Sequence, residues 1–140
     1  LRFFNVYGKG QSNAYAGVIT KFLKNIERNE SIEILGNGNN TRDYVFIDDL
    51  IHGILQAIKN IKGQRGNIYN LASGKSTSVN DLAFLMLKIS KKKLEIIHKS
   101  PRPGDLLFSE VLISKAKEEL QYNPKFNLEL GLTKLFQEME

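Results

Sequence analysis

Two arginines, Arg42 and Arg102, are the residues whose type and setting most clearly indicate chemistry in this sequence. Arg42 is expected near the end of a turn-rich loop that begins at Gly36, and Arg102 on a second loop, stiffened by Pro101 and Pro103. A guanidinium is a planar fork of donors that fits phosphate oxygens in bidentate geometry. The two arginines together could therefore hold a diphosphate.

Each arginine also has a simpler interpretation, as a surface residue paired with the acid beside it, Asp43 or Asp105. No catalytic centre follows from the residues alone, because the sequence has no helix-borne histidine pair, no G-x-S-x-G elbow and no P-loop. The run at Gly36 also fails the dinucleotide pattern G-x-G-x-x-G, since Thr41 stands where the third glycine belongs.

Metal and nucleic-acid sites receive little support. The sequence has no cysteine and two histidines, which excludes a disulfide or a thiolate metal site, and His98 is expected to be a surface or hydrogen-bonded histidine. The net charge of +5 allows nucleic acid, but no aromatic residue interleaves the lysines at 91–93. We expect these lysines to close a helix, where cations meet the negative end of its dipole.

The composition is that of one ordinary domain. The chain has 140 residues, of which 41% are hydrophobic, enough to bury roughly two-thirds of its unfolded surface. No apolar run approaches the ~20 residues that span a bilayer, and no signal-peptide plan opens the chain, so we expect a cytoplasmic protein without a membrane partner. The run from Leu1 to Gly8 already reads as a strand, which suggests a fragment of a longer protein.

Strands and helices are expected to alternate along the chain, which predicts an α/β fold. Strands are expected at 1–8, 32–34, 67–71 and 94–98. Helices are expected from about Tyr15 to Glu27, from Asp48 or Asp49 as cap, after the cap Ser78, from the cap Ser114 through Leu120, and after the cap Asn127. The second of these helices is expected to bury an apolar stripe of Leu50, Ile51, Ile54, Leu55 and Ile58.

Four ordered blocks carry a family resemblance: 2–8, 36–50, 69–74 and 101–105. In order and spacing they resemble the C-terminal portion of the extended short-chain dehydrogenases, in the NAD-dependent epimerase/dehydratase family. Within that family the resemblance is greatest to members such as UDP-glucose 4-epimerase. The resemblance implies that residues 1–140 form a single C-terminal, substrate-binding segment with strands of a Rossmann-type parallel sheet and several helices. It also implies that the N-terminal NAD-binding half lies outside this chain.

Site residues follow from the same resemblance. Asn5 would donate to the phosphates of a nucleotide-diphosphate sugar, with Phe4 beside the nicotinamide of NAD. Arg42 and Arg102 match the two arginines that hold the diphosphate.

Further positions would complete the pocket. Tyr44 would line it, and Asp105 would accept from the ribose hydroxyls. Val18 and Leu35 would shape the space for the base and ribose.

The implied activity is that of a nucleotide-sugar epimerase, with a UDP-sugar as substrate, NAD as cofactor bound mainly by the missing half, and a homodimer as the full-length protein. In such an enzyme a tyrosinate takes a hydroxyl proton while sugar C4 is transiently oxidised. This segment would hold the diphosphate, contribute no catalytic residue and be inactive alone. Two alternatives remain open: a 4,6-dehydratase or decarboxylase of the same family, and a non-catalytic module that binds nucleotide or nucleic acid.

Overall fold

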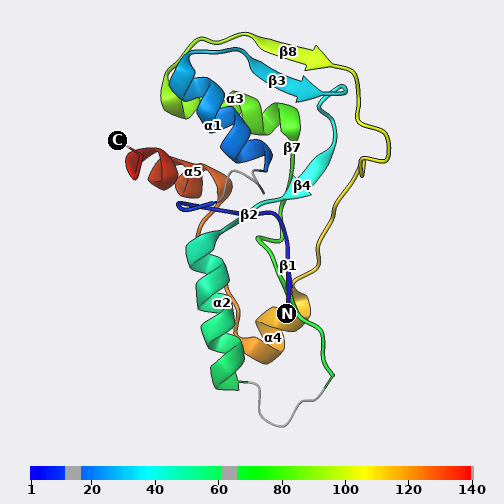
Figure 1. Cartoon of the computed structure of the whole chain (residues 1–140). Helices are drawn as coiled ribbons and strands as arrows, with labels where there is room; N and C mark the ends of the chain where they lie inside the picture. Colours follow the sequence, from blue (N-terminus) through cyan, green and yellow to red (C-terminus); the bar gives the residue numbers. More distant parts are fainter. Residues whose placement is uncertain (12–16, 61–65, 140) are drawn as a thin grey trace.

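The computed structural model describes residues 1–11, 17–60 and 66–139, in which short strands alternate with helices (Figure 1). The helices are α1 (Val18–Arg28), α2 (Ile47–Asn60), α3 (Val79–Ser90), α4 (Ser114–Leu120) and α5 (Leu128–Gln137). The strands are β1 (Arg2–Phe3), β2 (Val6–Tyr7), β3 (Ile32–Leu35), β4 (Thr41–Asp43), β5 (Val45–Phe46), β6 (Asn70–Leu71), β7 (Ser76–Ser78) and β8 (Ile96–Lys99). The predicted α/β class is confirmed.

The strands pair two by two. β1 with β6, β2 with β5 and β3 with β8 are parallel, whereas β4 and β7 run antiparallel. Parallel neighbours need long crossover connections, and every segment that joins two of these paired strands contains a helix.

The first core cluster lies around β3 and β8, with α1 and α3 packed against this pair at the top of Figure 1. α1 presents Ile19, Phe22, Leu23 and Ile26 to this core, at the helical spacing that the sequence predicts. β3 alternates buried and exposed side chains, as a half-buried strand should. The predicted start of α1 at Tyr15 lies outside the described residues.

The second core cluster lies below, where α2 and α4 pack beside β6 (Figure 1). The stripe predicted for α2 is wrong in part. Leu50 is buried and Ile54 is half-buried, but Ile51, Leu55 and Ile58 are 48%, 50% and 71% exposed. α2 is apolar on more than one face, so periodicity alone could not tell which face enters the core.

The caps predicted at Ser78 and Asn127 are confirmed, whereas those predicted at Ser114 and at Asp48 or Asp49 are wrong. Ser78 accepts from the amide of Asp81, and Asn127 accepts from the amide of Leu130. The N-cap of α4 is Ile113 instead of Ser114, without a side-chain hydrogen bond.

The aspartates of α2 lie in its first turn and have distant partners. Asp49 is buried and accepts from the amides of Lys125 and Phe126, at 2.8 Å each, while Asp48 pairs with Lys134. Both therefore attach the segment around α5 to α2.

The predicted opening strand is interrupted. Asn5 has a φ of 25°, which breaks the run into β1 and β2, and the two short strands pair with different partners. The chain thereby passes from the second core cluster, where Phe4 packs, to the first, which buries Tyr7.

Candidate functional site

A pocket of about 790 Å³ opens beside α1, β3 and β4, and it collects most of the side chains that the sequence singled out. Predicted site residues that line it are Asn5, Val18, Leu35, Arg42, Tyr44, Arg102 and Asp105. The structure thus brings together residues up to a hundred positions apart in the chain. Phe4 does not line the pocket and packs, half-buried, against the second core cluster.

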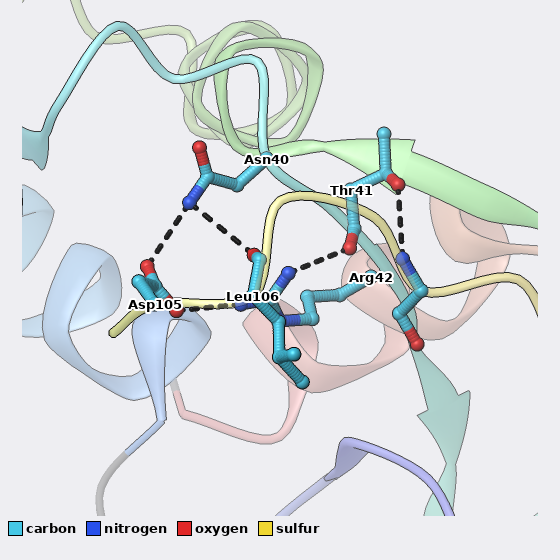
Figure 2. Close-up of polar contacts among 6 residues, drawn as sticks. Asn40, Thr41, Arg42, Asp105 and Leu106 are labelled. Atoms are coloured by element: carbon cyan, nitrogen blue, oxygen red, sulfur yellow. Dashed lines mark hydrogen bonds and ion pairs between the residues drawn. The ribbon is translucent and has the colours of Figure 1, made fainter. Parts of the chain in front are cut away.

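Arg42 lies in the middle of β4, not near the end of a loop as predicted, because residues 41–43 pair with β7. Its Nη1 donates to the carbonyl of Thr41 at 2.8 Å, and its Nη2 lies 2.7 Å from Oδ1 of Asp105 (Figure 2). The Arg42 side chain is 18% exposed, so it is largely desolvated and held in one direction. A strand supports the guanidinium more rigidly than a loop would.

Asp105 is engaged through both carboxylate oxygens. Oδ1 forms the ion pair with Arg42, and Oδ2 accepts a hydrogen bond from Nδ2 of Asn40 at 3.0 Å (Figure 2). A carboxylate has further lone pairs, so this arrangement leaves room for a ligand hydroxyl. The simpler interpretation, an arginine paired with a nearby acid, applies to Arg42, but its partner is Asp105 and not the adjacent Asp43.

Asp43 has a structural position instead. It is fully buried, and its two carboxylate oxygens accept from the amides of Ser73 and Gly74 at 2.7 Å each. These bonds attach β4 to the turn between β6 and β7, directly beside Arg42. The backbone carbonyl of Asp43 also accepts from Nδ2 of Asn5 at 3.0 Å, which orients that side chain at the pocket.

Tyr44 is 5% exposed, and its buried hydroxyl has no hydrogen-bond partner within the described parts of the chain. Burial raises the pKa of Tyr44 to about 12, against a smaller opposing effect of the Arg42 charge. The hydroxyl is therefore protonated at neutral pH and can donate a hydrogen bond. An unpaired buried hydroxyl costs free energy that a ligand acceptor would recover.

Val18 and Leu35 lie at the first turn of α1 and the end of β3, and Leu35 is 43% exposed. Arg102 lies on the loop after β8, where its carbonyl accepts from the amide of Asp105 at 3.3 Å. This turn places Asp105 and Arg102 at the same pocket.

Sequence reasoning missed Asn40. It lines the pocket, donates to Asp105, and also lies 3.5 Å from the carbonyl of Leu106 (Figure 2). In the sequence it is one of several asparagines in a turn, and its partner lies 65 residues away, so no local signal distinguishes it.

Metal and membrane functions find no support in the described ranges. Residues 1–11, 17–60 and 66–139 contain no group of three or more His, Cys, Asp or Glu that could hold a metal ion. Within those ranges no helix has the length and apolar character to cross a bilayer. His98 is exposed and hydrogen-bonded to Asn80, as expected of a satisfied histidine.

Comparison with known proteins settles the family. The model of the NAD dependent epimerase/dehydratase family matches residues 1–72, slightly more than half of the chain. The chain belongs to this family. Among its relatives, a putative UDP-glucose 4-epimerase of Methanocaldococcus jannaschii is 35% identical over 96% of this chain, and UDP-glucuronate 4-epimerase 4 of Arabidopsis thaliana is 34% identical over 96%.

Solved structures of family members agree. UDP-glucose 4-epimerase of Thermotoga maritima, determined with UDP-glucose, matches 99% of this chain with a TM-score of 0.89 and 35% identity. UDP-glucuronic acid 4-epimerase of Bacillus cereus, in complex with UDP-glucuronic acid and NAD, matches 99% with a TM-score of 0.89 and 29% identity. These neighbours confirm a Rossmann-type epimerase fold for this chain.

The chain spans less than half of each relative. It covers 43% of the M. jannaschii protein, 34% of the A. thaliana protein and 45% of both structures. The glycine turn at 36–40 directs the carbonyls of Gly38 and Asn40 at the amides of Asn80 and Val79 in α3, so these carbonyls are not part of an amide cradle for a phosphate.

Proposed function

We propose that this chain is the nucleotide-sugar-binding part of an NAD-dependent nucleotide-sugar 4-epimerase, and that its pocket grips the diphosphate of a UDP-sugar. The observation that carries the proposal is the convergence of Arg42 and Arg102 on one pocket with Asn5 and Tyr44. Two guanidinium forks, an amide and a hydroxyl are all donors, which matches the acceptor oxygens of a diphosphate. Relatives named for UDP-sugars support this choice of ligand.

In this proposal the chain contributes orientation. Holding the diphosphate fixes where the sugar lies, and a fixed sugar reacts as though its concentration were very high. NAD, held mainly by the other half of the enzyme, would supply the hydride acceptor for the oxidation at C4. Dehydratases and decarboxylases of nucleotide sugars would use the same grip, so the reaction itself is tested by product analysis of the intact enzyme.

Binding of UDP to the intact protein tests the proposal, with Tyr44→Phe as the matched variant. At ~100 times its dissociation constant, UDP should stabilise the wild type by about 2.7 kcal/mol and raise its unfolding midpoint by several degrees. Tyr44→Phe should bind UDP roughly three- to tenfold more weakly, because it loses one hydrogen bond to the ligand. Calorimetric titration measures the affinities, and thermal unfolding measures the midpoints.

Without UDP, Tyr44→Phe should be at least as stable as the wild type, since the variant no longer buries an unpaired hydroxyl. dTDP, GDP and a short DNA duplex serve as competing ligands. Stabilisation by DNA alone, or equal affinity of the variant and the wild type for UDP, would contradict the proposed grip.

We also propose that the NAD-binding half docks on the lower face of this chain, around β1 and α2. Within the described residues β1 pairs only with β6, so its other edge presents backbone N–H and C=O groups without a strand partner. Phe3 on β1 is 51% exposed, and α2 leaves Ile51, Leu55 and Ile58 in solvent. Relatives more than twice as long contain enough additional chain to cover this apolar surface.

A charge on this surface should destabilise the intact protein. Leu55→Glu is expected to lower its free energy of unfolding by about 2 kcal/mol or more, because the carboxylate would be buried against the docked half. Phe84→Glu, at an apolar residue of α3 that is 63% exposed, should change it by no more than ~0.5 kcal/mol. Denaturant unfolding gives these values.

The oligomeric state of the Leu55→Glu variant shows whether the NAD-binding half or a second copy of the protein covers α2. If Leu55→Glu converts a homodimer into a stable monomer, a second copy covers α2 and the docking proposal is wrong. Loss of stability with an unchanged oligomeric state supports it.

A further inference from the structure

Asn80, at the start of α3, is hydrogen-bonded to the turn between β3 and β4 through its backbone amide and its side-chain amide. Its amide donates to the carbonyl of Gly38 at 3.0 Å, and its Nδ2 donates to the carbonyl of Asn37 at 2.9 Å. Nδ2 also lies 3.3 Å from Oδ1 of Asn39, and Oδ1 of Asn80 lies 3.1 Å from Nε2 of His98. Since Nδ2 is the donor to the turn, Oδ1 is the acceptor and His98 donates to it.

The turn packs tightly against the side chain of Asn80. Gly38 has a φ of 73°, in the left-handed region that favours glycine, and a Cβ at this position would collide with the side-chain amide of Asn80. Glycine therefore serves two purposes here, the positive φ and the close approach. The turn and the side chain of Asn80 are therefore in close contact at Gly38.

The same turn leads directly to the pocket. The carbonyl of Asn40 accepts from the amide of Val79, the neighbour of Asn80, at 3.1 Å. Nδ2 of Asn40 donates to Asp105, and Asp105 holds the guanidinium of Arg42 (Figure 2). Asn80 is thus linked to Arg42 by the backbone of the turn and by the hydrogen bonds of Asn40 and Asp105.

We propose that Asn80 is a positioning residue for ligand binding at the pocket. Its side chain, supported by His98, fixes the turn that carries Asn40, and Asn40 and Asp105 in turn orient the guanidinium of Arg42. Asn80 does not line the pocket itself. This role rests on the proposed function of Arg42 as a phosphate ligand. It adds a residue that touches no substrate and acts only through the turn.

Asn80→Ala tests the role in the intact protein. We expect its dissociation constant for UDP to rise roughly tenfold, the equivalent of losing one or two hydrogen bonds that hold the turn. In steady-state kinetics, KM for the nucleotide sugar should rise by a similar factor while kcat stays within about twofold, because the variant retains every residue that touches the sugar. A general loss of folded protein would instead lower kcat and leave KM unchanged.

Lys88→Ala is the control on the same helix, since Lys88 is 73% exposed and pairs with Glu129 on α5, away from the turn. It should match the wild type. At position 98, His98→Gln keeps a donor for Asn80 and should bind UDP like the wild type, whereas His98→Leu should bind a fewfold more weakly.

Amide hydrogen exchange of residues 36–42 gives a readout that does not depend on the ligand. Exchange should be faster in Asn80→Ala and unchanged in Lys88→Ala. If the wild type binds no UDP, the proposed function fails, and exchange alone decides whether Asn80 fixes the turn. If the wild type binds and Asn80→Ala has the same affinity and the same exchange, the positioning role is overturned and the proposed function stands.

Discussion

Arg42→Ala is expected to raise the dissociation constant of the intact protein for UDP by roughly a hundredfold, or about 2.7 kcal/mol. Hydrogen bonds to a charged group contribute about 1.5–3 kcal/mol each, and a bidentate arginine can make two to a diphosphate. Arg42 is already held by Thr41 and Asp105, so little side-chain entropy remains to be lost on binding. Calorimetric titration with UDP and steady-state KM measure the effect.

Part of the expected loss of affinity in Arg42→Ala comes from the charge of Asp105. Without Arg42, the Asp105 carboxylate keeps its hydrogen bond from Asn40 but loses its cationic partner, so its negative charge would repel the phosphates of a bound UDP. The double variant Arg42→Ala/Asp105→Asn removes that repulsion, so it should recover some affinity while remaining weaker than the wild type. Lys117→Ala removes one positive charge from α4, outside the pocket, and should leave binding unchanged. Wild-type affinity in Arg42→Ala would refute the assignment of Arg42.

Asp43→Ala is expected to cost the fold about 3 kcal/mol. The variant leaves two amides, those of Ser73 and Gly74, without their carboxylate acceptor inside the fold, and an unsatisfied group costs about 1–3 kcal/mol. Because Asp43 is fully buried, water cannot replace the carboxylate without opening the structure. Urea unfolding measures the free-energy difference, provided that the slope with denaturant is unchanged.

Two variants keep this prediction specific. Asp48→Ala removes an aspartate whose ion pair with Lys134 is about 40% exposed on both sides, and it should cost no more than ~1 kcal/mol. Asp43→Asn preserves one acceptor oxygen and should lie between the wild type and the alanine variant. Equal stabilities of Asp43→Ala and Asp48→Ala would show that the two amides find other partners.

The sequence predicts best where the signal is local. Ser78 and Asn127 were found as caps because a cap acts on an amide three residues away. α1 and β3 were found because their apolar periodicities are clean. The two arginines are singled out by their chemistry, and the other predicted residues that line the pocket follow only from the family resemblance.

The errors share a cause, which is a partner distant in the chain. Asp49 reads as a helix cap, but its amide partners lie 76 and 77 residues later. Arg42 reads as a loop residue, but β4 exists only because β7 pairs with it. Ile51, Leu55 and Ile58 read as core, and the chain alone cannot say which apolar face of α2 meets the rest of this segment.

The break at Asn5 lies between β1 and β2. Before it, β1 belongs to the surface proposed to receive the NAD-binding half, and after it β2 enters the half of the molecule that contains the pocket. The docking surface proposed above also includes α2, which follows the kink, so only its β1 part precedes Asn5. The kink at Asn5 therefore connects one strand of the proposed docking surface directly to the wall of the pocket, which Asn5, Val6 and Tyr7 line.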